Sequence, residues 1–179
     1  MRIFELPSKA GGSGPKAPGG KKLSGAAVTL RSVEPADEEF LLGLYATTRA
    51  DELALTDWSD EQKAAFVRHQ FDAQTQHYRE HYPTASFDLI LVDGEPAGRL
   101  YVDRWPSETR IMDIALLPER RGHGIGGELI EQIQAEGRDV SVHVERFNPA
   151  QRLYARLGFE PEDAGPVYVL MRWRAPAST

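Results

Sequence analysis

Segment 122–127 contains four glycines and directly follows two arginines, a combination that could hold a phosphate. Without a Cβ, glycine lets the backbone adopt a positive φ and turn its N–H groups toward an anion. Arg120 and Arg121 add fixed positive charge. Apolar residues recur at helical spacing after the turn, so the positive end of a helix would lie at the glycines. The turn therefore predicts a pyrophosphate site formed by Arg121, Gly122, His123, Gly124, Ile125, Gly126 and Gly127.

The same glycines fit a second phosphate-binding pattern. Gly122, Gly124 and Gly127 read G-x-G-x-x-G, and Glu145 follows about where a dinucleotide-binding acid would lie. In a dinucleotide fold the strand runs straight into its first glycine, whereas here segment 118–121 intervenes. Only one further helix and one or two strands are expected afterwards, fewer than the repeats which that fold needs. The context therefore argues against a dinucleotide site.

A second motif begins at Asn148, which lies 22 positions after Gly126. It continues Asn-Pro-Ala-Gln-Arg-Leu-Tyr-Ala-Arg-Leu-Gly-Phe, with the tyrosine at position 154. Together with the run Arg-x-x-Gly-x-Gly that starts at Arg121, this segment resembles motifs A and B of the GNAT superfamily of acetyl-coenzyme A-dependent N-acetyltransferases. The resemblance extends over residues 27–174. One departure is the spacing from Asn148 to Tyr154, six positions where many members have seven.

The resemblance implies that an acetyl group passes directly from acetyl-coenzyme A to an amine, so the absence of cysteine is no obstacle. It implies an α+β fold with a central mixed, mostly antiparallel sheet, flanked by helices and splayed between its fourth and fifth strands. The pantetheine arm would lie in that gap. Backbone groups of Leu116 and Leu117 would pair with pantetheine and polarise the thioester carbonyl, and Asn148 would contact pantetheine.

The resemblance also suggests Tyr154 as the general acid, because a phenol with an unperturbed pKa of about 10 can donate a proton to a departing thiolate. The general base is left unassigned, since the position where some family members carry Glu falls near Arg110. From the residues alone, His143 and Asp113 rank first and Asp57 is a further candidate. A structural hydrogen-bonding role remains open for each of them.

The acceptor amine is expected near the loop 53–58, between the first two helices. Asp57 would attract a cationic amine, and Trp58 would form an apolar wall. A solvated acidic loop explains the same residues. Small amines, amino acids, aminoglycosides, peptide N-termini and protein lysines all remain possible acceptors.

Two other functions fit parts of the chain. His77-Tyr78-Arg79-Glu80-His81 reads H-x-x-E-H, which is typical of a group of zinc peptidases and would place two imidazoles on one helix face. No third ligand region stands out, and Pro83 ends the expected helix at once. The alternative to an enzyme is a domain that binds acyl-coenzyme A as a sensor or interaction module, because a fold does not fix a function.

Periodicity predicts the elements that must position these residues. Pro35 opens a first helix, Ser59 and Gln62 form a capping box for a second, and Asp93-Gly94 joins two strands in a hairpin. Asn148 is expected as the N-cap of the last helix, with Pro149 at its first position and Gly158 just past its end. Strands are expected at 27–33, 86–92, 97–105, 109–117, 139–144 and 167–173, with a helix between the glycine turn and Gly137.

Composition predicts the domain boundaries and excludes several classes of protein. A Gly-, Pro- and Lys-rich stretch predicts a flexible arm at 1–25, before one N-acetyltransferase domain at 26–175. The net charge of −6 argues against nonspecific nucleic-acid binding. No apolar run is long enough for a membrane helix, and no metal ligand set is expected. The chain has no cysteine, which is compatible with a cytoplasmic protein whose partners are acetyl-coenzyme A and a small-molecule or peptide amine.

Overall fold

The computed structural model describes residues 22–23 and 26–177. The expected arm at 1–25 lies outside the described residues, except for a two-residue strand, β1. The elements follow one another as β1 (Lys22–Leu23), β2 (Ala26–Ser32), η1 (Pro35–Asp37), α1 (Glu38–Ala54), α2 (Asp60–His81), β3 (Ser86–Val92), β4 (Glu95–Arg104), β5 (Glu108–Leu116), η2 (Pro118–Arg120), α3 (Ile125–Gln134), β6 (Asp139–Glu145), α4 (Gln151–Arg156), β7 (Glu160–Ala164) and β8 (Tyr168–Trp173).

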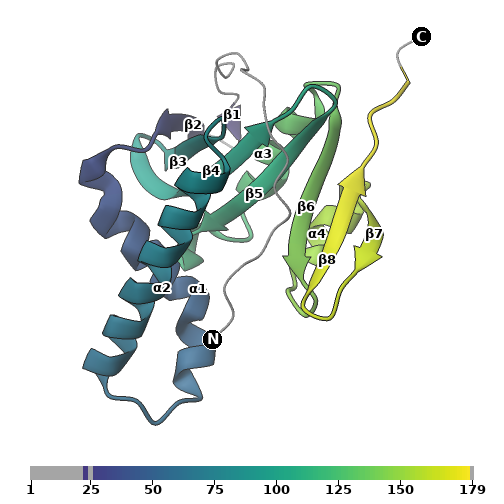
Figure 1. Ribbon diagram of the computed structural model, residues 1–179. Coiled ribbons are helices and arrows are strands. Elements are labelled where there is room, and N and C mark those ends of the chain that lie inside the picture. The colour runs from purple at the N-terminus through teal and green to yellow at the C-terminus, as the bar shows by residue number, and fades with distance from the viewer. Residues whose placement is uncertain (1–21, 24–25, 178–179) are drawn as a thin grey trace.

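The strands form one sheet in the order β1-β2-β3-β4-β5-β6-β8-β7 (Figure 1). Every neighbouring pair is antiparallel except β5 and β6, which run parallel. A parallel pair needs a crossover connection, and here α3 supplies it. The mixed, mostly antiparallel sheet flanked by helices is therefore confirmed.

The sheet splits between β5 and β6. Only Glu108–Ile111 pairs with Asp139–Val142, although β5 runs on to Leu116 and β6 to Glu145. Just past the paired segment, β5 carries an extra residue, because Tyr101 lies opposite Asp113 and Val102 opposite Ile111, which leaves Met112 without a partner. Such a bulge bends a strand. The gap expected between these two strands is present, and Figure 1 shows them diverging toward its open end.

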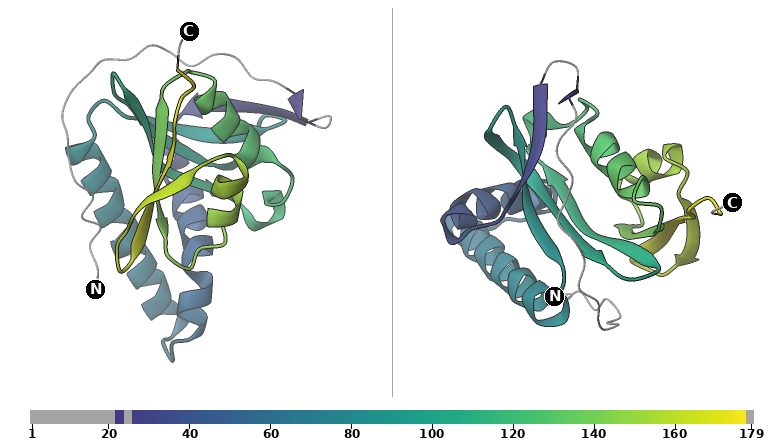
Figure 2. Two further views of the ribbon diagram at one scale, coloured as in Figure 1. Left: turned by 90° about the vertical axis from the view of Figure 1, so that its right-hand side faces the viewer. Right: turned by 90° about the horizontal axis from the view of Figure 1, so that it is seen from above.

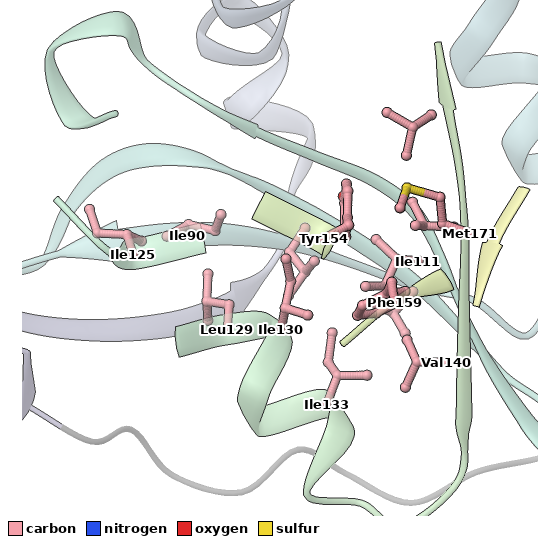
Figure 3. Close-up of a cluster of buried hydrophobic side chains, with 14 of the residues drawn as sticks. Ile90, Ile111, Ile125, Leu129, Ile130, Ile133, Val140, Tyr154, Phe159 and Met171 are labelled. Atoms are coloured by element: carbon pink, nitrogen blue, oxygen red, sulfur yellow. The ribbon is translucent and has the colours of Figure 1, made fainter. Parts of the chain in front are cut away.

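Helices cover both faces of the sheet (Figure 2). On one face α1 and α2 pack over β3 and β4, with Leu41, Tyr45, Phe71 and Leu89 in their core. On the other face α3 and α4 enclose the main core, part of which is drawn in Figure 3. Its labelled members are Ile90, Ile111, Ile125, Leu129, Ile130, Ile133, Val140, Tyr154, Phe159 and Met171. Burying one such side chain stabilises the fold by about 1.5–3 kcal/mol.

The helix boundaries follow local chemistry. The side chain of Ser59 accepts from the Gln62 N–H at 3.3 Å, and the Gln62 side chain accepts from the Ser59 N–H at 2.9 Å, so the predicted capping box is confirmed. Pro35 opens a short 3-10 turn that leads into α1. In α3 the apolar positions Ile125, Leu129 and Ile133 face the core, as their spacing predicts.

Two elements differ from expectation. The strand β7 was not expected, because Glu-Pro-Glu-Asp-Ala contains no β-branched or aromatic residue. Its position at the sheet edge tolerates a proline and charges. The prediction that Asn148 is the N-cap of α4 is wrong, because the regular helix begins at Gln151, after a turn. In the described ranges, no helix is both long enough and apolar enough to cross a bilayer.

Candidate active site

The glycine turn presents backbone donors at the start of α3. Gly122 and Gly124 have φ values of 76° and 83°, which L-residues adopt only with strain. Gly124 is the N-cap and has no side chain to cap the helix, whose first backbone bond runs from Glu128 N to Gly124 O. The N–H groups of Ile125, Gly126 and Gly127 therefore have no partner within the helix, which makes this terminus an anion site.

Arginine and histidine side chains surround this turn. The Arg121 Nε donates to the backbone oxygen of Leu116 at 2.9 Å, and its Nη2 donates to Thr47 Oγ1 at 3.3 Å. His123 Nδ1 lies 2.8 Å from the backbone oxygen of Arg121. The exposed guanidinium of Arg121 thus lies between the glycine turn, the end of β5 and α1.

The free edge of β5 borders the gap. The Leu117 N–H donates to Ala97 O at 2.9 Å, and the Leu117 oxygen accepts from Arg120 N at 2.9 Å, so both backbone groups of Leu117 are engaged by the protein. Backbone groups alternate in direction along a strand. Those of Leu116 consequently face the gap, beyond the last residue of β5 that pairs with β6. Of the two expected contacts, Leu116 alone presents its N–H there.

Two residues of the second motif lie close to the gap. Asn148 is exposed and accepts from the Ala150 N–H through Oδ1 at 2.9 Å, which leaves its amide NH₂ available as a donor. Tyr154 on α4 is 3% exposed and packs edge to face on Phe159, with ring centroids 5.3 Å apart. Burial, and then the Asp113 carboxylate, raise the pKa of Tyr154 well above its usual value, so the phenol holds its proton at neutral pH.

Asp113 points to the face covered by α1 and α2, where it forms an ion pair with Arg99. The Arg99 side chain is buried and also donates to Gln74 Oε1 at 2.9 Å. Its guanidinium lies 5.1 Å from the ring centroid of Tyr101. A carboxylate that compensates a buried guanidinium serves as its structural partner, which opposes a role as a free base.

His143 contacts Arg110, whose Nη1 lies 3.1 Å from His143 Nδ1. A guanidinium only donates, so Nδ1 is the acceptor and the imidazole is neutral. Burial first, and then the Arg110 charge, lower the pKa of His143 to about 4. At neutral pH this imidazole is unprotonated, but it is a weak base toward an ammonium group whose pKa lies near 10.

The two residues expected to meet the acceptor lie away from these groups. Asp57 and Trp58 are in the turn between α1 and α2, and Figures 1 and 2 show this hairpin projecting beyond the sheet. Trp58 is 42% exposed and packs edge to face on Phe66 of its own hairpin, at 5.2 Å. The structure therefore brings Asp113, His143 and Tyr154 to the gap, and it leaves Asp57 and Trp58 at the tip of the hairpin.

Sequence reasoning missed Arg49 and Glu145 as neighbours across the gap. Arg49 lies on α1, where its Nε donates to Tyr45 Oη at 3.2 Å and its Nη1 pairs with Glu52 at 3.2 Å. Burial lowers the pKa of Arg49, but the Tyr45 hydroxyl and the Glu52 and Glu145 carboxylates raise it overall. One signal was available for Glu145, because strand alternation places it on the same face as His143.

The H-x-x-E-H segment lies on α2. The His77 and His81 rings stack with centroids 4.2 Å apart, and Glu80 accepts from Gln76 Nε2 at 2.7 Å. In the described part of the chain, no three His, Cys, Asp or Glu residues are close enough to hold a metal ion. A cavity of about 580 Å³ lies between the start of α1 and α2, and no residue of β5, β6 or the glycine turn lines it.

Both the sequence and the fold of this chain are similar to those of known proteins. A family model described as acetyltransferase (GNAT) family matches residues 49–159. No curated protein matches the chain.

Solved structures show the same fold. A PaiA N-acetyltransferase from Thermoplasma acidophilum, in complex with coenzyme A, has a TM-score of 0.61 and 18% identity, and the match covers 83% of this chain and 99% of that one. An acetyltransferase from Thermus thermophilus has a TM-score of 0.60 and 22% identity, over 82% and 96%. Ard1 from Thermoplasma volcanium has a TM-score of 0.59 and 20% identity, over 83% and 98%.

Proposed function

Because the chain belongs to the GNAT acetyltransferase family, we propose that it transfers an acetyl group from acetyl-coenzyme A directly to an amine of a small molecule or peptide. The observation that carries this proposal is the uncapped start of α3 beside the unpaired edge of β5. An anion site and an open strand edge, side by side, match the two chemically distinct parts of coenzyme A. One is a pyrophosphate and the other is an amide-rich arm.

The residues around the turn fit the pyrophosphate. Three N–H groups at the start of α3 point out of the helix, and a Cβ built on Gly122 or Gly124 meets no atom within 4 Å, so the space beside the turn is open. Arg121 supplies a charge that can exchange its contacts with Leu116 and Thr47 for a phosphate oxygen. When bound, acetyl-coenzyme A supplies an activated acetyl group as a thioester.

The gap supplies positioning and polarisation. The N–H of Leu116 faces the gap and would donate to the thioester oxygen as negative charge develops there. The amide of Asn148 would hold the pantetheine arm from the opposite side of the gap. Tyr154 keeps its proton because it is buried, so it can protonate the departing sulfur. A high pKa makes Tyr154 a weak acid, so its catalytic contribution depends on placing the hydroxyl close to the departing sulfur.

The test is calorimetric titration with acetyl-coenzyme A, followed by measurement of thiol release with a panel of amines. We expect saturable binding by the wild type. Arg121→Glu should weaken that binding by about tenfold to hundredfold, because it replaces a charged donor with a like charge beside the pyrophosphate. The fold should stay intact, since Arg121 is exposed.

Arg79→Glu is the matched control, because it reverses an exposed arginine on α2 and should bind as the wild type does. Equal binding by Arg121→Glu and the wild type would refute the assignment of the glycine turn. Binding without thiol release from any amine would instead favour an acyl-coenzyme A sensor.

A further inference from the structure

We propose that Glu145 is the acceptor-site carboxylate, which binds the ammonium group of the incoming amine and takes its proton. This inference rests on the proposed acetyl transfer and names the group that the sequence left unassigned. It follows from the position of Glu145 in the gap, from its neighbours, and from the fact that Asp113, Glu52 and Glu108 are already paired.

The strand β6 places Glu145 at the open end of the gap. Val140, Val142 and Val144 point into the core under α3 and α4, so Ser141, His143 and Glu145 point to the opposite face. Val142 is the last residue of β6 that pairs with β5. Glu145 therefore lies on the stretch of β6 that no longer pairs with β5, on the face opposite the main core.

The neighbours of Glu145 come from both sides of the gap. Tyr168 lies directly opposite it on β8. Burial, and then the carboxylate of Glu145, raise the pKa of Tyr168 to about 12. From α1, the Arg49 guanidinium and the Tyr45 and Glu52 side chains act on the same groups. These residues give Glu145 a half-buried setting with two phenol rings nearby, in which a carboxylate attracts a cation more strongly than in water.

Glu145 is also a carboxylate that no cation of this region binds directly. Asp163 is a second one and acts on His143, but it lies on β7, separated from β6 by β8. Asp113 pairs with Arg99, Glu52 with Arg49, and Glu108 with Arg110 and Arg172. Within the described residues, the Glu145 side chain makes no hydrogen bond or ion pair. Arg49 acts on Glu145 as a nearby charge without forming an ion pair with it, because Arg49 pairs with Glu52. A half-buried carboxylate that no donor binds directly is suited to receive a cation from outside.

The chemistry balances with groups of this chain. The ammonium nitrogen gives one proton to Glu145, which frees the lone pair that forms the C–N bond as the C–S bond breaks. The nitrogen loses a second proton to become an amide. The first of these protons passes from Glu145 to water. The sulfur takes the hydroxyl proton of Tyr154, and the second proton from the nitrogen reprotonates Tyr154. The expected acceptor is therefore a primary amine that is cationic at neutral pH.

The experiment measures kcat/KM between pH 6 and 10.5 with three probes, phenethylamine, cadaverine and glycyl-lysine amide. Glu145→Gln should lower kcat/KM at pH 7 by about 10²-fold to 10³-fold, the usual contribution of a positioned base. The variant should approach the wild type above about pH 10, where the amine arrives already neutral. Glu145→Asp should keep part of the activity and the wild-type shape of the profile.

Glu52→Gln is the matched control, since it removes a nearby carboxylate that lies on α1 and pairs there with Arg49. It should keep kcat/KM within about threefold. Because Glu145 makes no side-chain bond, Glu145→Gln should bind acetyl-coenzyme A and melt as the wild type does. If Glu145 had a purely structural role, high pH would not restore the kcat/KM of Glu145→Gln.

The outcomes separate the two proposals. If the wild type releases thiol with a probe and Glu145→Gln matches it at pH 7, Glu145 is not the acceptor carboxylate and acetyl transfer stands. If loss of activity in Glu145→Gln is the same at every pH, its role as proton acceptor is also overturned. If the wild type binds acetyl-coenzyme A but acetylates none of the probes, both proposals fall.

Discussion

Arginines on β4 and β5 decide what the nearby acid and base side chains can do. Asp113 balances the buried charge of Arg99, and His143 accepts from Arg110. Each residue type suits proton transfer, but each already contacts a guanidinium in the fold. The residue type and its position on the strand therefore do not determine the role of Asp113 or His143. The arginine on the neighbouring strand determines it.

The burial of His143, together with its contact with Arg110, predicts a pH dependence of stability. An unfolded histidine titrates near pH 6.5, whereas in the fold the pKa of His143 is about 4. Between these two pH values the unfolded chain binds more protons than the folded protein. The contribution of His143 to stability is therefore complete above pH 6.5 and is lost as the pH falls toward 4. Urea unfolding should show the wild type losing about 1–2 kcal/mol more than His143→Gln between pH 7 and 4.5, a range that allows for solvent screening of the half-buried ring.

His69→Gln provides the comparison, because His69 is an exposed histidine on α2. It should follow the wild type throughout this pH range. Parallel curves for the wild type and His143→Gln would show that burial and the Arg110 contact do not suppress protonation of His143 in solution.

At the scale of elements, the glycine turn and α1 predict opposite effects of the same substitution. Gly124→Ala should lower the free energy of unfolding by about 1–2 kcal/mol, because φ is 83° while the new methyl meets nothing within 4 Å. Gly43→Ala, in the exposed middle of α1, should raise it by about 0.5–1 kcal/mol. Thermal melts of both variants test this, and a neutral Gly124→Ala would argue against the left-handed turn.

Elements with a strong local signal could be predicted from the sequence. The capping box at Ser59, the Asp93-Gly94 hairpin and the apolar spacing of α3 each express a local rule, and each element is present. The strand β7 has no such signal, because its edge position rather than its composition allows it to pair. The start of α4 was displaced because Asn148 caps a turn that precedes the regular helix.

At the scale of the whole molecule, the contacts of the site that the sequence could not predict are those that depend on strand register. The glycine turn and the second motif are contiguous in sequence, so they could be read directly. The pair Arg99–Asp113, the contact Arg110–His143 and the approach of Arg49 to Glu145 join residues 14, 33 and about 96 positions apart. Such contacts depend on how the strands pair and on how α1 packs against the sheet, and one sequence does not reveal either.

The split sheet also makes stability depend on a short junction. β5 and β6 share only four paired residues each, and a polar cluster reinforces them. In that cluster Glu108 on β5 accepts from Ser141 on β6, and from Arg172 on β8 at 2.6 Å. Glu108 thus links the half of the sheet that carries α1 and α2 to the half formed by β6, β8 and β7.

Glu108→Gln should accordingly lower the free energy of unfolding by about 2–4 kcal/mol, because it leaves Arg110 and Arg172 without their shared, mostly buried carboxylate. Glu162→Gln is the matched control, since Glu162 also pairs with Arg172 but is 41% exposed, and its loss should cost less than about 1 kcal/mol. Urea unfolding measures both. Equal losses would mean that the four paired residues hold the halves together without the carboxylate, whereas the expected difference would make Glu108 the electrostatic link that keeps the gap in register.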